Sequence, residues 1–116
     1  MGGYGNMLMD IPGHSNYLLS EDGVVYKRYT MAPIGINMSN GNARVTLDGV
    51  NYYLGKLMLS IFKKNEYRTG YKVFYIDGDK TNNNLNNLIW LSPSDIQLYS
   101  SYKIEYRIKM LSRARE

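Results

Sequence analysis

The sequence predicts an α+β domain, because it combines two hairpin turns between β-prone runs, one stripe of apolar residues at helical spacing, and an asparagine-rich turn after a short strand. At 116 residues the chain fits one domain. Hydrophobic residues make up 44% of it and charged residues 21%, a balance typical of a folded globular protein. We therefore expect one folding unit with a modest core.

The first half of the chain is predicted to form two β-hairpins joined by a loop. Residues 1–9 hold three glycines and no periodic pattern, which predicts a flexible N-terminal tail. β-Prone runs flank Glu21-Asp22-Gly23 and again Asp48-Gly49, and the second pair suits a two-residue turn because Asp and Gly tolerate positive φ. Residues 30–42, rich in Gly, Pro, Asn and Ser, are expected to form the connecting loop.

Residues 54–62 change to a helical period. Apolar side chains recur there at i, i+3, i+4, i+7 and i+8, which predicts a central amphipathic helix with lysines on its other face. A short strand over 71–76 then leads into the turn Asp77-Gly78-Asp79. The expected core residues are Leu54, Leu57, Met58, Ile61, Phe62, Val73, Ile76, Leu88 and Trp90.

The C-terminal region is expected to be helical. Ser92, followed three positions later by Asp95, resembles a capping box, and the helix is predicted to continue to near residue 113. Residues 101–116 are its basic part, in which the cations stack one turn apart: Lys103 and Arg107, then Lys109 and Arg113. This face is either the solvated side of a packed helix or a surface for phosphate or for an acidic protein.

Residue counts exclude several kinds of chemistry. The chain has no cysteine, which removes disulfides, thiolate catalysis and Cys-based zinc sites. The one histidine, His14, reads as a turn residue, so a His-based triad or metal cluster is not expected. Lys and Arg outnumber Asp and Glu by 14 to 10, which gives a net charge of +4 and a mild preference for polyanions. With neither a membrane-length apolar run nor a secretory signal pattern, an intracellular protein without a membrane partner is expected.

The segment "YIDGDKTNNNLNNLIWLS", residues 75–92, resembles the motif of the His-Asn-His (HNH) endonucleases of the phage and homing-endonuclease type. Two further segments fit that resemblance: "YLGKLMLSIFKKN" looks like the helix before the motif, and "DIPGHSNYLLSEDGVVYKRY" looks like the small module often found at the N-terminal end. Three segments in the family's order are much stronger evidence than a bare Asp-Gly-Asp turn. They imply an HNH-like domain over residues 10–100.

The resemblance also implies which positions would carry metal-dependent hydrolysis, which needs a general base and two metal ligands. Alignment on the Asp-Gly-Asp turn puts Tyr75 at the general-base position and Phe74 and Ile96 at the ligand positions. A tyrosine, with a pKa of about 10, is a poor base at neutral pH, and Phe and Ile have no lone pair for a cation. We therefore predict a degenerate ββα-metal motif without metal, cofactor or nuclease activity, and hence a chain that is not an enzyme.

What remains of the motif is its loop scaffold, for which a structural role is predicted. Asparagine side chains can bond loop backbone groups that have no sheet or helix partner. The predicted scaffold residues are Asp77, Gly78, Asp79, Asn82, Asn83, Asn87, Leu88 and Trp90. The two aspartates are read as a structural turn rather than a weak metal site, because no third ligand is identified.

The favoured function is that of an inactive HNH-like phage protein that binds nucleic acid without cleaving it, and duplex DNA is the expected ligand. The candidate contacts are Lys27, Arg28, Arg44, Lys56, Lys63, Lys64, Lys103, Arg107, Lys109 and Arg113. The 12 tyrosines are either stacking groups between these cations or amphipathic residues of the core and its rim.

The alternative function is that of a phage protein-binding module, either a virion component or an inhibitor of a host or defence enzyme. Tyrosine-rich surfaces suit protein recognition because the ring offers a large contact area with few torsions to freeze. For both functions the resemblance places the protein in the cytoplasm of an infected host cell or in the virion. An enzyme of unrelated chemistry is not expected, because the chain has no Gly-rich phosphate loop and no nucleophile beside a base.

Overall fold

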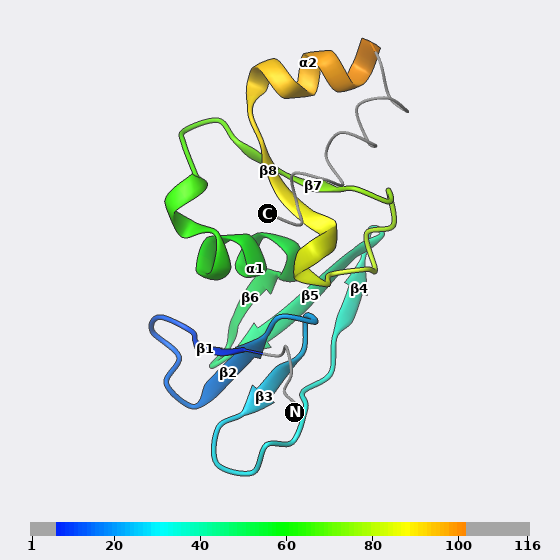
Figure 1. The fold of residues 1–116 in the computed structure, drawn as a ribbon. Coiled ribbons are helices and arrows are strands. Elements are labelled where there is room, and N and C mark those ends of the chain that lie inside the picture. The colour runs from blue at the N-terminus through cyan, green and yellow to red at the C-terminus, as the bar shows by residue number, and fades with distance from the viewer. Residues whose placement is uncertain (1–6, 102–116) are drawn as a thin grey trace.

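The computed structural model describes residues 7–101, whose strands form three separate antiparallel sheets around a central helix (Figure 1). The predicted α+β class is confirmed. In chain order the elements are β1 (Leu8–Asp10), β2 (Tyr17–Ser20), β3 (Val25–Lys27), β4 (Asn37–Ser39), β5 (Asn42–Leu47), β6 (Val50–Tyr53), α1 (Leu54–Phe62), η1 (Lys64–Glu66), β7 (Lys72–Tyr75), η2 (Leu85–Asn87), β8 (Leu88–Leu91) and α2 (Pro93–Ser101).

The N-terminal sheet has the order β1-β2-β3. Its β2–β3 hairpin is the predicted one, and Gly23 in the turn has a φ of 84°. β1 pairs antiparallel with β2, with Leu8 opposite Ser20 and Asp10 opposite Leu18. The prediction of a flexible tail over 1–9 is therefore wrong for residues 8–9, because a three-residue edge strand is too short to show a period; residues 1–6 lie outside the described residues.

The second sheet has the order β4-β5-β6. Asp48 and Gly49, with φ values of 50° and 81°, form the predicted two-residue turn between β5 and β6. The expected loop over 30–42 contains one more strand, since β4 pairs with β5 across Asn40 and Gly41, which also have positive φ. Asn-Gly is itself a hairpin signal, but the flanking residues lack the β-branched run that usually accompanies it.

His14 ties the first sheet to the second. It is buried, and its Nδ1 lies 2.8 Å from Oδ2 of Asp48 while its Nε2 lies 2.6 Å from the hydroxyl oxygen of Tyr52. These partners are 34 and 38 positions away in the chain, so local sequence does not reveal them. The turn residue of the sequence analysis is thus a buried, doubly partnered contact between two sheets.

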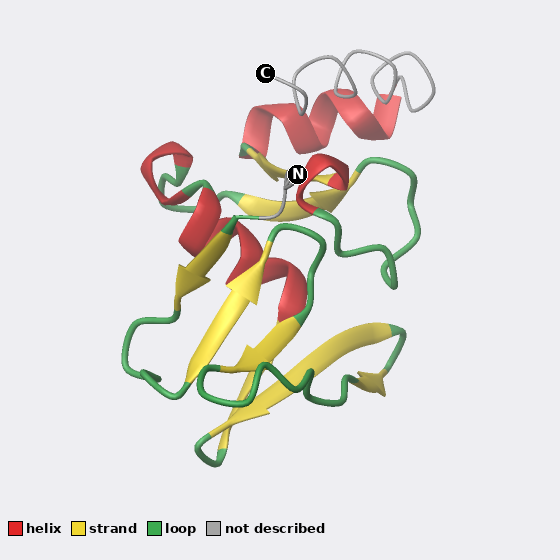
Figure 2. Ribbon diagram, turned by 60° about the horizontal axis from the view of Figure 1, so that its bottom comes forward, coloured by secondary structure: helices red, strands yellow, loops and turns green. Residues whose placement is uncertain are grey.

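Helix α1 lies between the β4-β5-β6 sheet and the β7–β8 hairpin, with α2 beyond that hairpin (Figures 1 and 2). Leu54, Leu57 and Met58 on its predicted stripe are buried, as is Leu59, whereas the later stripe positions are half-buried. The β8 strand is missing from the predicted elements because all four of its residues are buried, which removes the alternation that marks a half-exposed strand.

Two apolar clusters stabilise the fold. The larger one joins the two N-terminal sheets, α1 and Trp90 of β8, with the predicted core residue Val73 only partly buried at its edge. The smaller one lies between the β7–β8 hairpin and α2, and consists of Phe74, Ile76, Ile89 and Leu91 with Ile96 and Tyr99 packed against it. Within the described part of the chain, no helix is both long and apolar enough to cross a membrane.

The start of α2 has the predicted capping box. The backbone N–H of Asp95 donates to Oγ of Ser92 at 3.1 Å, and the backbone N–H of Ser92 donates to Oδ2 of Asp95 at 3.4 Å. These bonds satisfy donors that the first turn of a helix leaves open. The described helix ends at Ser101, so the predicted basic helix over 101–116 lies, apart from that first residue, outside the described residues.

Candidate functional site

The turn after β7 is held together by side chains that bond its own backbone. Oδ1 of Asp77 accepts from the backbone N–H of Asp79 at 2.8 Å and from Nδ2 of Asn87 at 2.9 Å, while Oδ2 accepts from Nδ2 of Asn82 at 2.8 Å. Asn87 also accepts from the backbone N–H of Asp77 at 3.0 Å and donates to the carbonyl oxygen of Asn82 at 3.0 Å. Both oxygens of the Asp77 carboxylate are thus engaged within the loop.

The remaining scaffold residues continue this pattern. Oδ1 of Asp79 accepts from the backbone N–H and the hydroxyl group of Thr81, at 2.9 and 2.6 Å. Asn83 is buried and donates to the carbonyl oxygen of Lys80 at 3.3 Å. Trp90 lies outside the loop, in β8, where its Nε1–H donates to the carbonyl oxygen of Lys63 at 2.9 Å.

The loop is docked on the first hairpin. The backbone N–H of Leu85 donates to the carbonyl oxygen of Glu21 at 2.8 Å. A Cβ at Gly23 would lie 2.7 Å from the carbonyl oxygen of Asn83, so the loop backbone sits against that glycine. The N-terminal module and the motif loop therefore position each other.

Tyr75, at the position that the resemblance assigns to the general base, is a hydrogen-bond donor here. Its hydroxyl group donates to Oδ1 of Asn83 at 2.8 Å, and burial raises the pKa of this tyrosine above its ordinary value. The hydroxyl group also lies against the start of α1, since a Cβ at Gly55 would come within 2.2 Å of it. These contacts keep the phenol neutral and fixed in place at neutral pH.

Phe74 and Ile96, at the two expected ligand positions, belong to the smaller apolar cluster. The ring of Phe74 is 8% exposed and lies 4.8 Å from the ring of Tyr99, and Ile96 packs against the same cluster. Among residues 7–101, no three His, Asp or Glu side chains converge. The residues at these positions therefore do not fit the divalent ion that the resemblance implies.

Two hollows open beside each other on the face formed by α1, β7 and the loop, and they share Lys56. The first, which we name the Tyr75 hollow, has a volume of about 270 Å³ and is lined by Asn42, Tyr53, Lys56, Val73, Tyr75 and Lys80. The second, which we name the Trp90 hollow, has a volume of about 300 Å³ and is lined by Lys56, Ser60, Lys64, Tyr67 and Trp90. Both combine aromatic rings with lysines.

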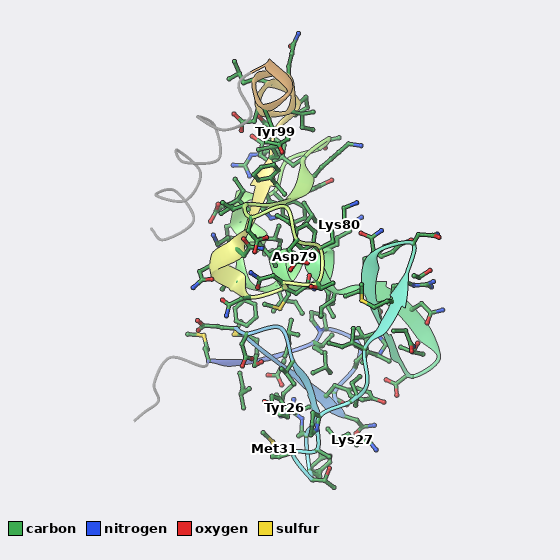
Figure 3. All side chains as sticks on the ribbon, turned by 90° about the vertical axis from the view of Figure 1, so that its right-hand side faces the viewer. Tyr26, Lys27, Met31, Asp79, Lys80 and Tyr99 are labelled. Carbon is green, nitrogen blue, oxygen red and sulfur yellow. The ribbon has the colours of Figure 1, made fainter. Side chains whose placement is uncertain are left out.

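Some of the predicted contact residues meet at these hollows. Lys56 and Lys64 line them, and the guanidinium of Arg44 lies 5.6 Å from the ring centroid of Tyr53, which lines the Tyr75 hollow. Lys80 is a fourth cation of this face and is not among the predicted contact residues. Its position directly after Asp79 in the motif could have identified it as a candidate contact residue. Figure 3 shows both residues on the loop.

Other predicted contact residues lie elsewhere. Lys27 is in the N-terminal module with Tyr26 and Met31, near the bottom of the view and well below Lys80 (Figure 3). Arg28 is held by the carboxylate of Asp10 and, at 2.5 Å, by the carbonyl oxygen of Ser15. Lys63 is half-buried at the end of α1. Lys103, Arg107, Lys109 and Arg113 lie outside the described residues.

Taken together, the loop, its strand pair and the flanking helices form an HNH-endonuclease-like fold. This chain is similar to a solved structure of the HNH homing endonuclease I-HmuI, with a TM-score of 0.70 and 25% sequence identity. That structure describes how I-HmuI binds and cleaves DNA. The likeness covers 82% of this chain and 58% of that protein. Searches against models of known protein families and against curated proteins find no match.

This likeness corrects one prediction. Tyr75, Phe74 and Ile96, at the positions of the general base and the two metal ligands, predict a chain that is not an enzyme. The scaffold as a whole, however, is similar to that of an endonuclease that cleaves DNA. Substitutions at three positions are not sufficient to set that similarity aside. The prediction that the chain is not an enzyme is therefore wrong.

Proposed function

We propose that this chain binds duplex DNA with the face that carries the Tyr75 and Trp90 hollows. The observation that carries the proposal is the row of exposed lysines on this face, with Lys56 shared by the two hollows and Lys64 and Lys80 in one hollow each. None of these three forms an ion pair with a described carboxylate. Unpaired cations on a DNA-binding type of fold suit the phosphates of a duplex.

The number of cations sets the expected salt dependence. Each phosphate contact releases condensed counterions, so three contacts lower the affinity about fortyfold between roughly 50 and 200 mM salt. Arg44, beside Tyr53, adds a further cation at the edge of the same face. The proposal therefore predicts an affinity that is measurable at low salt and falls steeply as salt is added.

The test compares two single-lysine variants by fluorescence anisotropy with a short labelled duplex. Lys56→Ala is expected to lower the affinity about tenfold at ~0.1 M salt and to reduce the salt slope by about one contact. Lys72→Ala is the matched control, because Lys72 is also exposed but alternates along β7 with Val73 and Tyr75, which face the Tyr75 hollow. Its affinity is expected to stay within about twofold of the parent, the size expected when no direct contact is lost.

Equal losses in the two variants, or no duplex binding at low salt, would contradict the proposal. Incubation of the same protein with supercoiled plasmid and magnesium or manganese measures cleavage separately, because the solved structure similar to this chain is that of an endonuclease. The binding proposal does not depend on that result.

A second candidate function, binding of a protein partner, is favoured by the N-terminal module. Tyr29 is 82% exposed there and lines a hollow of about 220 Å³ with Asn16, Tyr17, Lys27 and Thr30. An exposed ring beside a small hollow is typical of a protein-recognition surface. A pull-down with and without nuclease tests it, since a protein partner stays bound after nucleic acid is removed and is lost with Tyr29→Ser.

The setting of both functions follows from the resemblance to phage nucleases. We propose that the protein acts in the cytoplasm of an infected host cell or in the virion. Mass spectrometry of purified virions and of infected-cell lysate distinguishes the two locations.

A further inference from the structure

The Trp90 hollow has a rigid aromatic wall. Trp90 is 2% exposed and is anchored by the bond from its Nε1–H to the carbonyl oxygen of Lys63. The ring of Tyr67 makes an edge contact with it, with the ring centroids 4.8 Å apart at 62°, and a second edge contact with Tyr71 at 6.3 Å. Two ring contacts hold Tyr67 in place, yet its side chain remains 43% exposed. A fixed and half-open ring of this kind offers a surface for stacking.

The other lining residues of the hollow are polar and cationic. Lys56, Ser60 and Lys64 follow one another at four-residue spacing and are all exposed. Lys56 and Ser60 lie one turn apart on α1, and Lys64 follows at the start of η1. Among the described residues the lining includes no Asp or Glu, so no described carboxylate neutralises the two lysine charges within the hollow. The rings of the lining therefore suit a flat ligand ring, and its two lysines suit an anion, with the hydroxyl group of Ser60 beside them.

A nucleotide is the ligand class that combines these two features. Its base stacks on an aromatic ring in a manner that tolerates any sequence, and its phosphate pairs with lysine. At about 300 Å³ the hollow is at the small end of ligand sites, which suits one ring system rather than an extended chain. In a paired duplex both faces of each internal base are covered by stacking, so a base reaches Tyr67 only when it is extruded.

We infer that the Trp90 hollow binds one unpaired nucleotide, so that the chain prefers DNA with an extruded base to fully paired DNA. This inference rests on the proposed DNA-binding function. Lys56 also lines the Tyr75 hollow, so the phosphate of the extruded nucleotide lies at the junction between the two hollows. Tyr67 supplies the stacking surface, and Lys64 is the second cation that binds the phosphate.

The experiment compares two labelled probes of equal length, a perfect duplex and the same duplex with a single-nucleotide bulge that carries 2-aminopurine. The bulged probe is expected to bind about tenfold more tightly, the size of one base-stacking contact. Its 2-aminopurine fluorescence is expected to be quenched on binding by the stack with Tyr67. The emission of Trp90, the one tryptophan of the chain, is expected to change with the bulged probe and not with the duplex.

Three variants test the role of the hollow. Tyr67→Leu is expected to abolish the tenfold preference, which is the ratio of the affinities for the two probes, and Tyr67→Phe, which keeps the ring, is expected to retain it. Ser60→Phe fills the hollow from an exposed helix position and is expected to abolish the preference without disturbing a buried contact. If Tyr67→Leu fails to fold, Ser60→Phe still tests whether the hollow is needed for the preference.

The failures of the two proposals are distinguishable. Equal affinity for both probes, with duplex binding intact, would overturn the inference and leave the proposed function standing. A preference that survives both Tyr67→Leu and Ser60→Phe would also overturn it, since the selectivity would then come from elsewhere. Absence of binding to either probe would remove the proposed function together with the inference.

Discussion

The loop around Asp77 differs from the neighbouring face that carries Lys56, Lys64 and Lys80, which we name the lysine face. The polar side chains of the loop bond to one another and to its backbone, whereas the lysines are exposed. In the loop, the carboxylate of Asp77 and the amide of Asn87 are bonded to each other and to the loop backbone. On the face, Lys56 and Lys64 are exposed and form no ion pair with a described carboxylate. Polar groups satisfied inside a loop stabilise it, whereas unpaired cations are available to a ligand.

This difference indicates that the residues that shape the motif loop are not the residues expected to bind DNA. Most of the residues that carry the resemblance are those of the loop, and their contacts explain the loop's shape. The cations and rings that suit DNA lie on α1, directly after η1 and in the middle of the loop, at Lys56, Tyr67 and Lys80. Stability and binding should therefore respond to different substitutions, which mutagenesis can check.

The largest expected effect is on the loop side. Asn87→Ala removes three hydrogen bonds of a buried side chain, two to loop backbone groups and one to the Asp77 carboxylate. Because buried partners are left unsatisfied, the free energy of unfolding is expected to fall by about 3 kcal/mol. Urea unfolding followed by Trp90 fluorescence measures this change.

Asn86→Ala is the matched control for that substitution. Asn86 is exposed and engages the loop through its backbone N–H, which donates to Oδ1 of Asn84 and which alanine retains. The free energy of unfolding is expected to change by less than about 0.5 kcal/mol. Similar losses for Asn86→Ala and Asn87→Ala would show that the side-chain bonds of the loop do not determine its stability.

The second effect is a loss of stability at the contact between the loop and α1. Gly55→Ala puts a Cβ 2.2 Å from the Tyr75 hydroxyl group and 3.3 Å from Oδ1 of Asn83, so the bond between those two side chains is expected to break. The expected loss is about 2 kcal/mol of unfolding free energy, against the small gain from alanine in a helix. In a Tyr75→Phe background the closest clash is gone, so the double variant should lose less than the sum of the single losses.

Sequence predicts those parts of this fold whose signals are local. The Asp48-Gly49 turn and the capping box of Ser92 and Asp95 each depend on residues that lie within four positions of one another, and both are present. The fully buried β8 is missed because it has no alternation, and the three-residue β1 is missed because it is too short to show any. Local pattern is thus a good guide to turns and caps and a poor one to buried or short strands.

The candidate site is harder to predict, because it is assembled from distant segments. Tyr67 meets Trp90 across 23 positions, so neither residue alone indicates a hollow. Lys80 is visible in the motif, but the motif does not tell that its side chain lies over the same hollow as Lys56. The resemblance identifies the scaffold correctly, whereas the conclusion against an enzyme, which relied on three positions of that scaffold, is wrong.

The third effect is on the lysine side and should leave stability unchanged. Lys64→Ala is expected to lower duplex affinity roughly tenfold at ~0.1 M salt, because one phosphate contact is lost. The free energy of unfolding is expected to stay within about 0.5 kcal/mol, since the side chain is exposed and unpaired with any described carboxylate. A variant that loses stability and affinity together would erase the distinction between the loop and the lysine face.

The smallest effect is a pH dependence at Tyr75, where the loop and the Tyr75 hollow meet. Burial raises the pKa of this hydroxyl group in the folded state, so above pH ~10 the unfolded chain loses the proton more readily than the folded one. Its contribution to stability is therefore complete below that pH and is lost as the pH rises toward the folded pKa.

Urea unfolding of the parent and of Tyr75→Phe, from pH 8 to 11, isolates this contribution. The difference in unfolding free energy between the two is expected to move against the parent above pH ~10. Tyr53→Phe, at a side chain that is 53% exposed, controls for the general effect of alkali and of removing a hydroxyl group. If the difference in unfolding free energy between the parent and Tyr75→Phe is constant across the pH range, the Tyr75 hydroxyl group is open to solvent. Tyr75 would then resemble the exposed lysines of the lysine face rather than the hydrogen-bonded side chains of the loop.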